Sequence, residues 1–305
     1  MSENSAQNSG GAFYFSSIAT DRQIFSFGGF ENTILSNNEA SDGAAIATFS
    51  SGSTLSVSTA IQFAQSAPGD SVPPCASGLE CNAIDDNHAY SGSIVALNAA
   101  GDAGSTSFTM YRGRMRRNRA NTLVGGNAYI DIEGSLLASN EISNGTLIFD
   151  TSNTLRIASS TIAYNTVGSD WLFSVILPPA SLQILHSLFV QPDTSIAAYT
   201  LGAGVPVTVR DIGTLNVNFD TGSNVQMLSD PFVDGANEDF HILLTSSAVD
   251  RWGTTNDPDD PPPTLDLDDA SRPYVKNSPS TPYDFGAYEA GASVDVIFRN
   301  GFDSP

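Results

Sequence analysis

The stretch TLRIASSTIAYN, at residues 154–165, decides the fold because it joins a short apolar strand to a phrase that recurs along the chain. The phrase has two small or polar residues, an aliphatic residue, two further residues and a final Asn. It returns about every 25 residues, a period that is typical of stacked repeats. The clear copies are TILSNN at 33–38, NAIDDN at 82–87, GRMRRN at 113–118, SLLASN at 135–140, STIAYN at 160–165 and GTLNVN at 213–218. Weaker copies are TAIQFA at 59–64 and HSLFVQ at 186–191.

Each repeat holds more than one strand. In several copies a Gly follows five positions after the final Asn, and a short apolar segment comes next. Examples are AAIATF at 44–49, SIVALN at 93–98 and TLIFD at 146–150. Segments of about four to six residues, separated by Gly, Asn and Ser, predict strands rather than helices.

Such strands pair best with the same strand one repeat later, parallel and about 4.8 Å away. The sequence therefore predicts an all-β, pectate-lyase-like parallel β-helix of about eight or nine coils. We expect it to be right-handed, the default for parallel crossovers. The Asn residues should form a ladder at a bend, because Asn tolerates left-handed backbone and its amides bond to each other. The central aliphatic residues should stack inward as one column: Leu35, Ile61, Ile84, Met115, Leu137, Ile162, Leu188 and Leu215.

The period divides the chain into three parts. Residues 1–222 carry the repeat and form the predicted β-helix. Residues 223–290 are rich in Asp and Pro, and we expect them to cap the last coil, whose strand edges would otherwise be unpaired. Residues 291–305 form a short tail. The chain opens in mid-pattern, so we expect a signal and an N-terminal cap upstream of it.

The net charge indicates which partners the protein can bind, and its cysteines indicate the compartment in which it folds. The formal net charge is −21, which argues against nucleic acid because phosphate binding needs a basic face. No apolar run is long enough for a transmembrane helix. Cys75 and Cys81 are separated by five residues inside a Pro/Gly loop, with no His or Cys pair at metal spacing nearby, so they predict a loop-closing disulfide and an oxidising compartment. Two free thiols are the alternative.

SGGAFYF at 9–15 and DGAAIATF at 42–49 stand beside Asn-rich turns. In this the chain resembles the right-handed β-helix proteins of bacterial surfaces, including those with polymorphic outer-membrane protein repeats. The C-terminal part resembles the "choice-of-anchor" β-helix proteins through four phrases in the same order. These are DPFVDGANEDF at 230–240, SSAVDRWG at 246–253, LDLDDASRP at 265–273 and DFGAYE at 284–289. Arg251 and Asp269 depart from the usual pattern.

The tail phrase VIFRNGFD at 296–303 is similar to an Ile-Phe-x-x-Gly-Phe-acid ending on exported proteins of some Gram-negative bacteria. Together these resemblances imply a secreted or surface-attached protein. They carry over no catalytic residues, because the group has no shared activity that maps onto named positions.

The clearest candidates for chemistry are Asp85, Asp86 and His88 in NAIDDNHAYSG. Glycosidases on β-helices use clustered carboxyl groups as acid and base, with a His nearby. A third carboxylate from a neighbouring coil is missing at the aligned positions. The alternative is structural, because one repeat later Asp85 and Asp86 align with Arg116 and Arg117, so interstrand ion pairs are expected.

A second cluster holds five of the chain's eleven arginines, Arg112, Arg114, Arg116, Arg117 and Arg119. Around an inward Met115, Arg114 and Arg116 should point outward together. An outward row formed by Arg112, Arg114 and Arg116 suits the uronate or sulfate groups of an anionic polysaccharide. These three residues are the predicted glycan-binding site.

An acidic segment near the C-terminus is the third candidate. Ca²⁺ is the one cofactor that its oxygen-rich composition suggests, although the spacing departs from calcium-loop patterns and prolines interrupt it. A solvated loop, with Asp266 and Arg272 fixing turns, is the alternative. The acidic residues are Asp257, Asp259, Asp260, Asp266, Asp268 and Asp269.

The sequence predicts a secreted or surface-exposed, non-enzymatic and adhesin-like protein that binds a polysaccharide or cell-envelope component along its flank. The alternative is a polysaccharide-active enzyme, a hydrolase or lyase, that uses Asp85, Asp86 and the Arg row. Lyase chemistry would also need a positioned base, and the only lysine is Lys276. The sequence leaves the ligand and the oligomeric state open.

Overall fold

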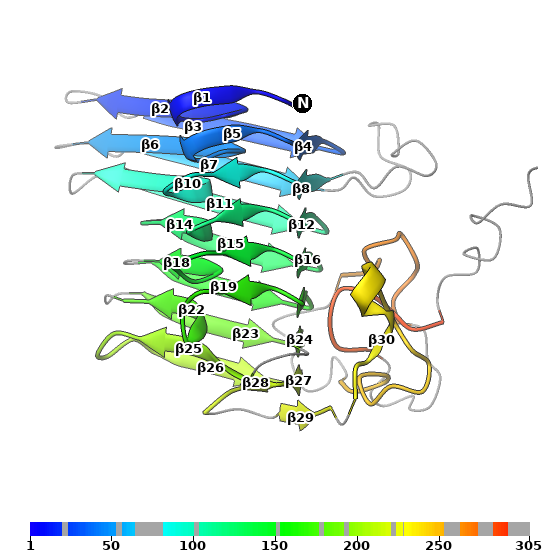
Figure 1. Cartoon of the computed structure of the whole chain (residues 1–305). Coiled ribbons are helices and arrows are strands. Elements are labelled where there is room, and N and C mark those ends of the chain that lie inside the picture. Colours follow the sequence, from blue (N-terminus) through cyan, green and yellow to red (C-terminus); the bar gives the residue numbers. More distant parts are fainter. Residues whose placement is uncertain are drawn as a thin grey trace, which may run out of the picture.

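The chain winds into stacked coils whose equivalent strands pair in parallel (Figure 1). The computed structural model describes residues 1–19, 24–52, 57–64, 82–100, 104–150, 153–176, 180–191, 195–220, 224–227, 229–252, 263–273 and 283–291. Two of the parallel sheets contain eight strands each, one from every coil, so the predicted parallel β-helix is confirmed with eight coils in the described residues.

Two long sheets form two sides of the coil. The first long sheet contains β2 (Phe13–Ala19), β6 (Ile46–Gly52), β10 (Ser93–Ala100), β14 (Thr122–Gly126), β18 (Ile148–Asp150), β22 (Trp171–Val175), β25 (Ile196–Leu201) and β28 (Val217–Asn218). The second long sheet contains β3 (Ile24–Glu31), β7 (Val57–Ala64), β11 (Gly104–Tyr111), β15 (Tyr129–Glu133), β19 (Thr154–Ala158), β23 (Ser181–Leu185) and β26 (Val207–Arg210).

Two sheets of shorter strands complete each turn. The flank sheet contains β4 (Ile34–Ser36), β8 (Ala83–Asp85), β12 (Arg114–Arg116), β16 (Leu136–Ala138), β20 (Thr161–Ala163), β24 (Leu188–Val190), β27 (Ile212–Leu215) and β29 (Asn224–Gln226). The narrow sheet contains β1 (Ser5–Ser9), β5 (Glu39–Asp42), β9 (His88–Ala89), β13 (Arg119–Ala120), β17 (Glu141–Ile142) and β21 (Thr166–Val167).

The inward column of the flank sheet confirms five of the eight predicted members. Leu35, Ile84, Met115, Leu137 and Ile162 are in register on successive coils and fully buried. The next member is Phe189, which pairs with Ile162. Stacking equivalent side chains in this way buries one continuous core, and burial of each large aliphatic group stabilises the fold by about 1.5–3 kcal/mol.

The other three predicted members lie elsewhere. Ile61 belongs to β7 in the second long sheet, so the segment between Asn38 and Asn87 is one large coil rather than two. Leu188 pairs with Thr161, and Leu215 with Val190, each one residue away from the inward position. For Leu188 the reason is that β24 is apolar at every position, so its sequence does not mark which side chain points inward.

The predicted Asn ladder is confirmed. Each side-chain amide donates to the Oδ1 of the Asn on the next coil at 2.8–3.0 Å, through Asn4, Asn38, Asn87, Asn118, Asn140 and Asn165. The left-handed residue is the one before each ladder Asn, for example Asp86 with φ 57° and Arg117 with φ 53°. Asn218 is not a member, because it lies exposed in β28.

A second ladder at the opposite end of the flank strands has no counterpart in the sequence analysis. The Oγ atoms of Ser135, Ser160 and Ser187 accept from the backbone N–H groups of Gly113, Ser135 and Ser160, respectively, at 3.0–3.1 Å. Both corners of the flank sheet are therefore held by side chains that satisfy buried backbone groups. This makes the spacing and direction of the flank strands regular.

The C-terminal residues form a lateral cover, defined as the described residues between 229 and 291. It includes the hairpin β30 (Phe232–Asp234) and β31 (Asp239–Ile242) with the 3-10 turn η1 (Gly235–Asn237). Figure 1 shows it beside the flank sheet rather than across the last coil. Apolar residues on both sides form one buried cluster, among them Leu136, Ala138, Ala163, Leu188, Val190, Phe232, Phe240, Trp252 and Phe285.

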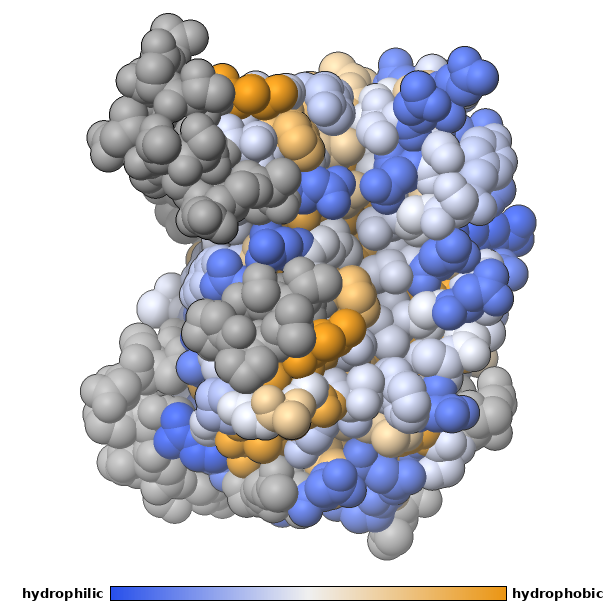
Figure 2. All heavy atoms as spheres, turned by 90° about the vertical axis from the view of Figure 1, so that its left-hand side faces the viewer, coloured by the Kyte–Doolittle hydropathy of each residue, from blue (hydrophilic) through white to orange (hydrophobic). Residues whose placement is uncertain are grey.

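This placement corrects the expected cap over the last coil. Apart from Thr161, the outward-facing positions of β16, β20 and β24 are apolar, so the flank of the β-helix carries a hydrophobic stripe that must be buried. The stack itself also extends beyond residue 222, because β29 pairs in parallel with β27. On the side of the molecule opposite the cover, Figure 2 shows hydrophilic residues with hydrophobic ones in separate patches.

Candidate functional site

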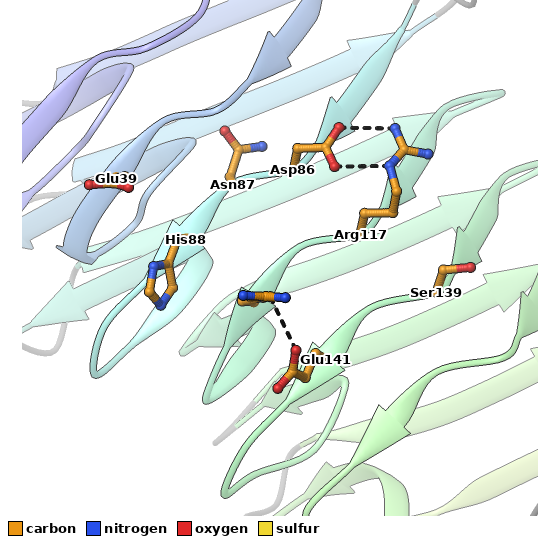
Figure 3. Close-up of a pocket in the computed structure, with 8 residues that line it drawn as sticks. Glu39, Asp86, Asn87, His88, Arg117, Ser139 and Glu141 are labelled. Carbon is orange, nitrogen blue, oxygen red and sulfur yellow. Dashed lines mark hydrogen bonds and ion pairs between the residues drawn. The ribbon is translucent and has the colours of Figure 1, made fainter.

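An open groove of about 510 Å³ crosses four successive coils next to the Asn ladder. Its lining residues come from all four of these coils, and Figure 3 shows how they follow the stack. They are Glu39, Asp86, Asn87, His88, Arg117, Arg119, Ser139 and Glu141. The groove is therefore polar, and it carries both signs of charge.

The narrow sheet positions one row of these side chains. Glu39 pairs with His88, His88 with Arg119, and Arg119 with Glu141, so the four lie in register along the helix axis. The next residue of each strand is apolar and buried, which follows from the two-residue alternation of a strand. Each row member also follows directly after a ladder Asn, so the ladder fixes where the row begins.

A second row comes from the left-handed corner before each ladder Asn. There Asp86 binds Arg117 through two hydrogen bonds of 2.9 and 3.0 Å. Arg117 also reaches Glu238 of the lateral cover at 2.6 Å. The hydrogen bonding of its guanidinium to Asp86 is the main cause that raises the pKa of Arg117 above its ordinary value. The predicted pairing of Asp86 with Arg117 is confirmed.

Asp85 lies below this surface. It is buried and binds Arg116 at 2.7 Å, with a further bond from the backbone N–H of Arg116. Burial raises the pKa of Asp85 above its ordinary value, and the charge of Arg116 opposes that effect. Since Asp85 does not line the groove, the structure separates it from Asp86 and His88, with which the sequence grouped it.

His88 lies beside an aromatic ring that the sequence analysis did not single out. The rings of His88 and Tyr90 have centroids 4.4 Å apart. The Tyr90 hydroxyl donates to the Glu39 carboxylate at 2.5 Å, and 59% of Tyr90 is exposed. Glu39, Tyr90 and Glu141 were therefore missed, although their common signal, a polar residue just after a ladder Asn or two positions further on, was present in the sequence.

The predicted glycan-binding arginines do not line this groove. Arg112 and Arg114 point outward from the flank, but the lateral cover buries both of them. Arg112 binds the carbonyl of Asp266 and the Asp269 carboxylate, while Arg114 binds Asp268 at 2.9 Å. Arg116 is buried against Asp85. A polysaccharide would reach this row only if the cover left the flank.

The acidic residues of the lateral cover serve as partners of these cations. Asp268 and Asp269 pair with arginines, and Asp266 accepts from the backbone N–H groups of Asp268 and Ala270 at 2.9 Å. Asp257, Asp259 and Asp260 lie outside the described residues. Within the described residues, no group of three or more His, Cys, Asp or Glu side chains is placed to hold a metal ion.

Three of the four C-terminal phrases, those at 246–253, 265–273 and 284–289, meet in one buried network. Arg272 binds Glu289 at 2.9 Å, and both side chains are completely buried. Arg272 also donates to the carbonyls of Gly286 and Asp284 at 3.1 and 3.0 Å. Asp284 accepts from the backbone N–H of Asp250, and burial raises its pKa to about 6. These motif residues shape the lateral cover and lie away from the groove.

His241 adds a pH-dependent link inside the cover. Its ring lies between Asp239 and Asp268 and against the ring of Tyr288. Burial alone would lower the pKa of His241, but the hydrogen bonds and charges of Asp268 and Asp239 outweigh it and raise the pKa to about 9. Because the folded pKa lies above the unfolded one, this contribution is complete below about pH 6.5 and lost as pH rises through 9.

We therefore expect the unfolding free energy of the protein to fall between about pH 6.5 and 9 through His241. In His241→Asn that fall should disappear, while the midpoint at pH 6 should be lower than in the unchanged protein. Thermal unfolding from pH 6 to 10 measures both. His88→Asn is the matched control and should keep the fall, and an unchanged profile in His241→Asn would contradict the assignment. Asp284 acts in a separate window, between about pH 4 and 6, where its raised pKa makes stability decrease as pH rises.

Cys75 and Cys81 lie outside the described residues, so the disulfide stays a prediction. Among the described residues there is no helix with the length and apolar character that crossing a bilayer requires.

Comparisons with protein-family models, with curated proteins and with solved structures find no match to this chain.

Proposed function

We propose that this protein is a secreted or surface-exposed β-helix scaffold, adhesin-like and non-enzymatic, that binds a glycan in the groove of the narrow sheet. The observation that carries the proposal is the groove itself. It is open, polar, and built on a rigid stack that places one row side chain on each of four coils. Saccharides need many hydrogen-bond donors and acceptors at fixed positions, and a rigid scaffold supplies these without ordering cost.

The ion pairs favour binding over hydrolysis. A glycosidase needs one carboxyl group as acid and a second as base or nucleophile, both facing the scissile bond. Here Asp85 is buried against Arg116, and Asp86 is held by both of its oxygens to Arg117. Both carboxylates therefore serve as interstrand partners, which supports a structural role for them.

The resemblance to bacterial surface proteins supports the proposed location. Three of its four C-terminal phrases converge on the buried Arg272–Glu289 network, so the similarity concerns residues that build the lateral cover. The composition fits the same location, because an acidic, lysine-poor chain stays soluble and does not bind nucleic acid.

A glycan array with the intact protein tests the proposal. We expect binding that Arg119→Ala weakens by about tenfold, the loss of one well-placed charged hydrogen bond. Arg210→Ala, an exposed arginine of the second long sheet, is the matched control and should bind like the unchanged protein. If the protein binds no glycan on the array at either low or physiological salt, the result would count against the proposed binding function. Cleavage of any polysaccharide that Asp86→Asn abolishes would establish the enzyme instead.

A further inference from the structure

We infer that the groove takes a neutral saccharide lying along the helix axis, with the ring of Tyr90 as its stacking surface. This inference rests on the proposed function and specifies the class of ligand. It departs from the anionic polysaccharide that the arginine content of the sequence suggests. Three features of the groove lead to it: the balance of its charges, the fixed ring of Tyr90, and the register of its row.

The charges of the groove disfavour an anionic ligand. Its lining has three carboxylates, Glu39, Asp86 and Glu141, against the guanidinium groups of Arg117 and Arg119. Each arginine is already paired, Arg117 with Asp86 and Glu238, and Arg119 with Glu141 at 3.1 Å. A uronate or sulfate would have to replace these carboxylates while approaching their negative charge, and the net charge of −21 adds to that repulsion.

A neutral saccharide meets none of these costs. Its hydroxyl groups donate to the carboxylate oxygens and accept from guanidinium N–H groups, so they join the ion pairs without breaking them. Hydrogen bonds to charged groups are stronger than neutral ones, which gives a neutral ligand favourable contacts at each coil. A row that contains both acceptors and donors is therefore better matched to hydroxyl groups than to anions.

Tyr90 supplies an apolar face beside this polar row. Tyr90 is 59% exposed, yet its ring is fixed at two points, by the hydroxyl bond to Glu39 and by contact with the His88 ring. Both contacts are to lining residues, so the ring lies at the edge of the groove. An aromatic ring that is already held in place loses little conformational freedom when an apolar sugar face packs on it.

The register gives the direction of the ligand. Glu39, His88, Arg119 and Glu141 occupy successive coils, so the row spans three steps of about 4.8 Å, or about 14 Å. Figure 3 shows Glu39, His88 and Glu141 following one another along the stack. A linear oligosaccharide along the axis contacts every member of the row, whereas one lying across it contacts a single coil.

Titration calorimetry with two oligosaccharides of equal length tests the inference: a neutral hexaose of β-linked glucose and a hexamer of galacturonate. We expect the neutral probe to bind at least about tenfold more tightly, and Tyr90→Ala to weaken its binding by about tenfold, as for loss of an aromatic anchor. Tyr90→Phe keeps the ring and should lose only about threefold. Tyr14→Ala, which removes a ring of similar exposure on the first coil, is the control and should change nothing.

The possible outcomes distinguish a failure of the neutral-ligand inference from a failure of the proposed function. Tighter binding of the galacturonate probe overturns the neutral-ligand inference and leaves the binding function standing. Equal affinities of Tyr90→Ala and the unchanged protein overturn the role of the ring. If neither hexamer binds and a broad array is also silent, the proposed function itself fails. Circular dichroism of each variant confirms that the β-helix is intact before these outcomes are compared.

Discussion

Arg272→Ala is expected to destabilise the lateral cover by about 3–5 kcal/mol, the usual cost of leaving one partner of a buried ion pair alone. The substitution leaves the Glu289 carboxylate without its cation in a completely buried site. It also removes donors from the carbonyls of Gly286 and Asp284. Chemical denaturation followed by Trp fluorescence measures the loss, because Trp252 is buried in the same cover.

The exposed pair Arg119–Glu141 provides the comparison. Its side chains are 69% and 60% exposed, so Arg119→Ala should change the unfolding free energy by less than about 1 kcal/mol. Arg272→Lys keeps the charge but not the forked geometry. Its loss of unfolding free energy should therefore lie between those of Arg272→Ala and Arg119→Ala. Equal stability of Arg272→Ala and the unchanged protein would show that Glu289 finds another partner and would refute the importance of the pair.

Asn118→Ala should lower the unfolding free energy by about 3 kcal/mol, because it removes hydrogen bonds from buried polar groups on both neighbouring coils. The Oδ1 of Asn118 accepts from the backbone and the side-chain amide of Asn87, both at 3.0 Å. Its own amide donates to the carbonyl of Ile84 and to Asn140. Urea denaturation with and without the substitution measures the effect.

Asn218→Ala is the matched control for the ladder. Asn218 has the same side chain but lies exposed in β28, where its amide meets the Oγ of Ser195. We expect a change within about 0.5 kcal/mol. If Asn118→Ala and Asn218→Ala lower the unfolding free energy equally, a ladder Asn contributes no more to stability than an ordinary surface amide. That result would contradict a stabilising role of the ladder.

The period of the Asn phrase was enough to predict the parallel stack and the ladder, because both depend on residues that repeat coil after coil. It was not enough to assign Ile61, Leu188 and Leu215. Ile61 lies in a coil enlarged by a long insertion, so a constant period counts one repeat too many. In β24 the three residues Leu188, Phe189 and Val190 are all apolar, and alternation cannot tell inward from outward.

The groove and the cover show what a linear pattern leaves out. Pairing of Asp85 and Asp86 with Arg116 and Arg117 followed from register between neighbouring coils, and the structure has it. Burial of Arg112 and Arg114 did not, because their partners Asp269 and Asp268 are more than 150 residues away in the chain. Such long-range contacts leave no periodic signal in the sequence. An arginine at an outward position is therefore predicted to be exposed even where a distant segment covers it.

The lateral cover also changes how the stack can come apart. In a solenoid each coil touches only its neighbours, so coils can in principle unzip one after another from an end. The cover contacts β12 through Arg114, β20 through Thr161 and β24 through the buried cluster. It bridges non-adjacent coils, so those coils must open together rather than one after another.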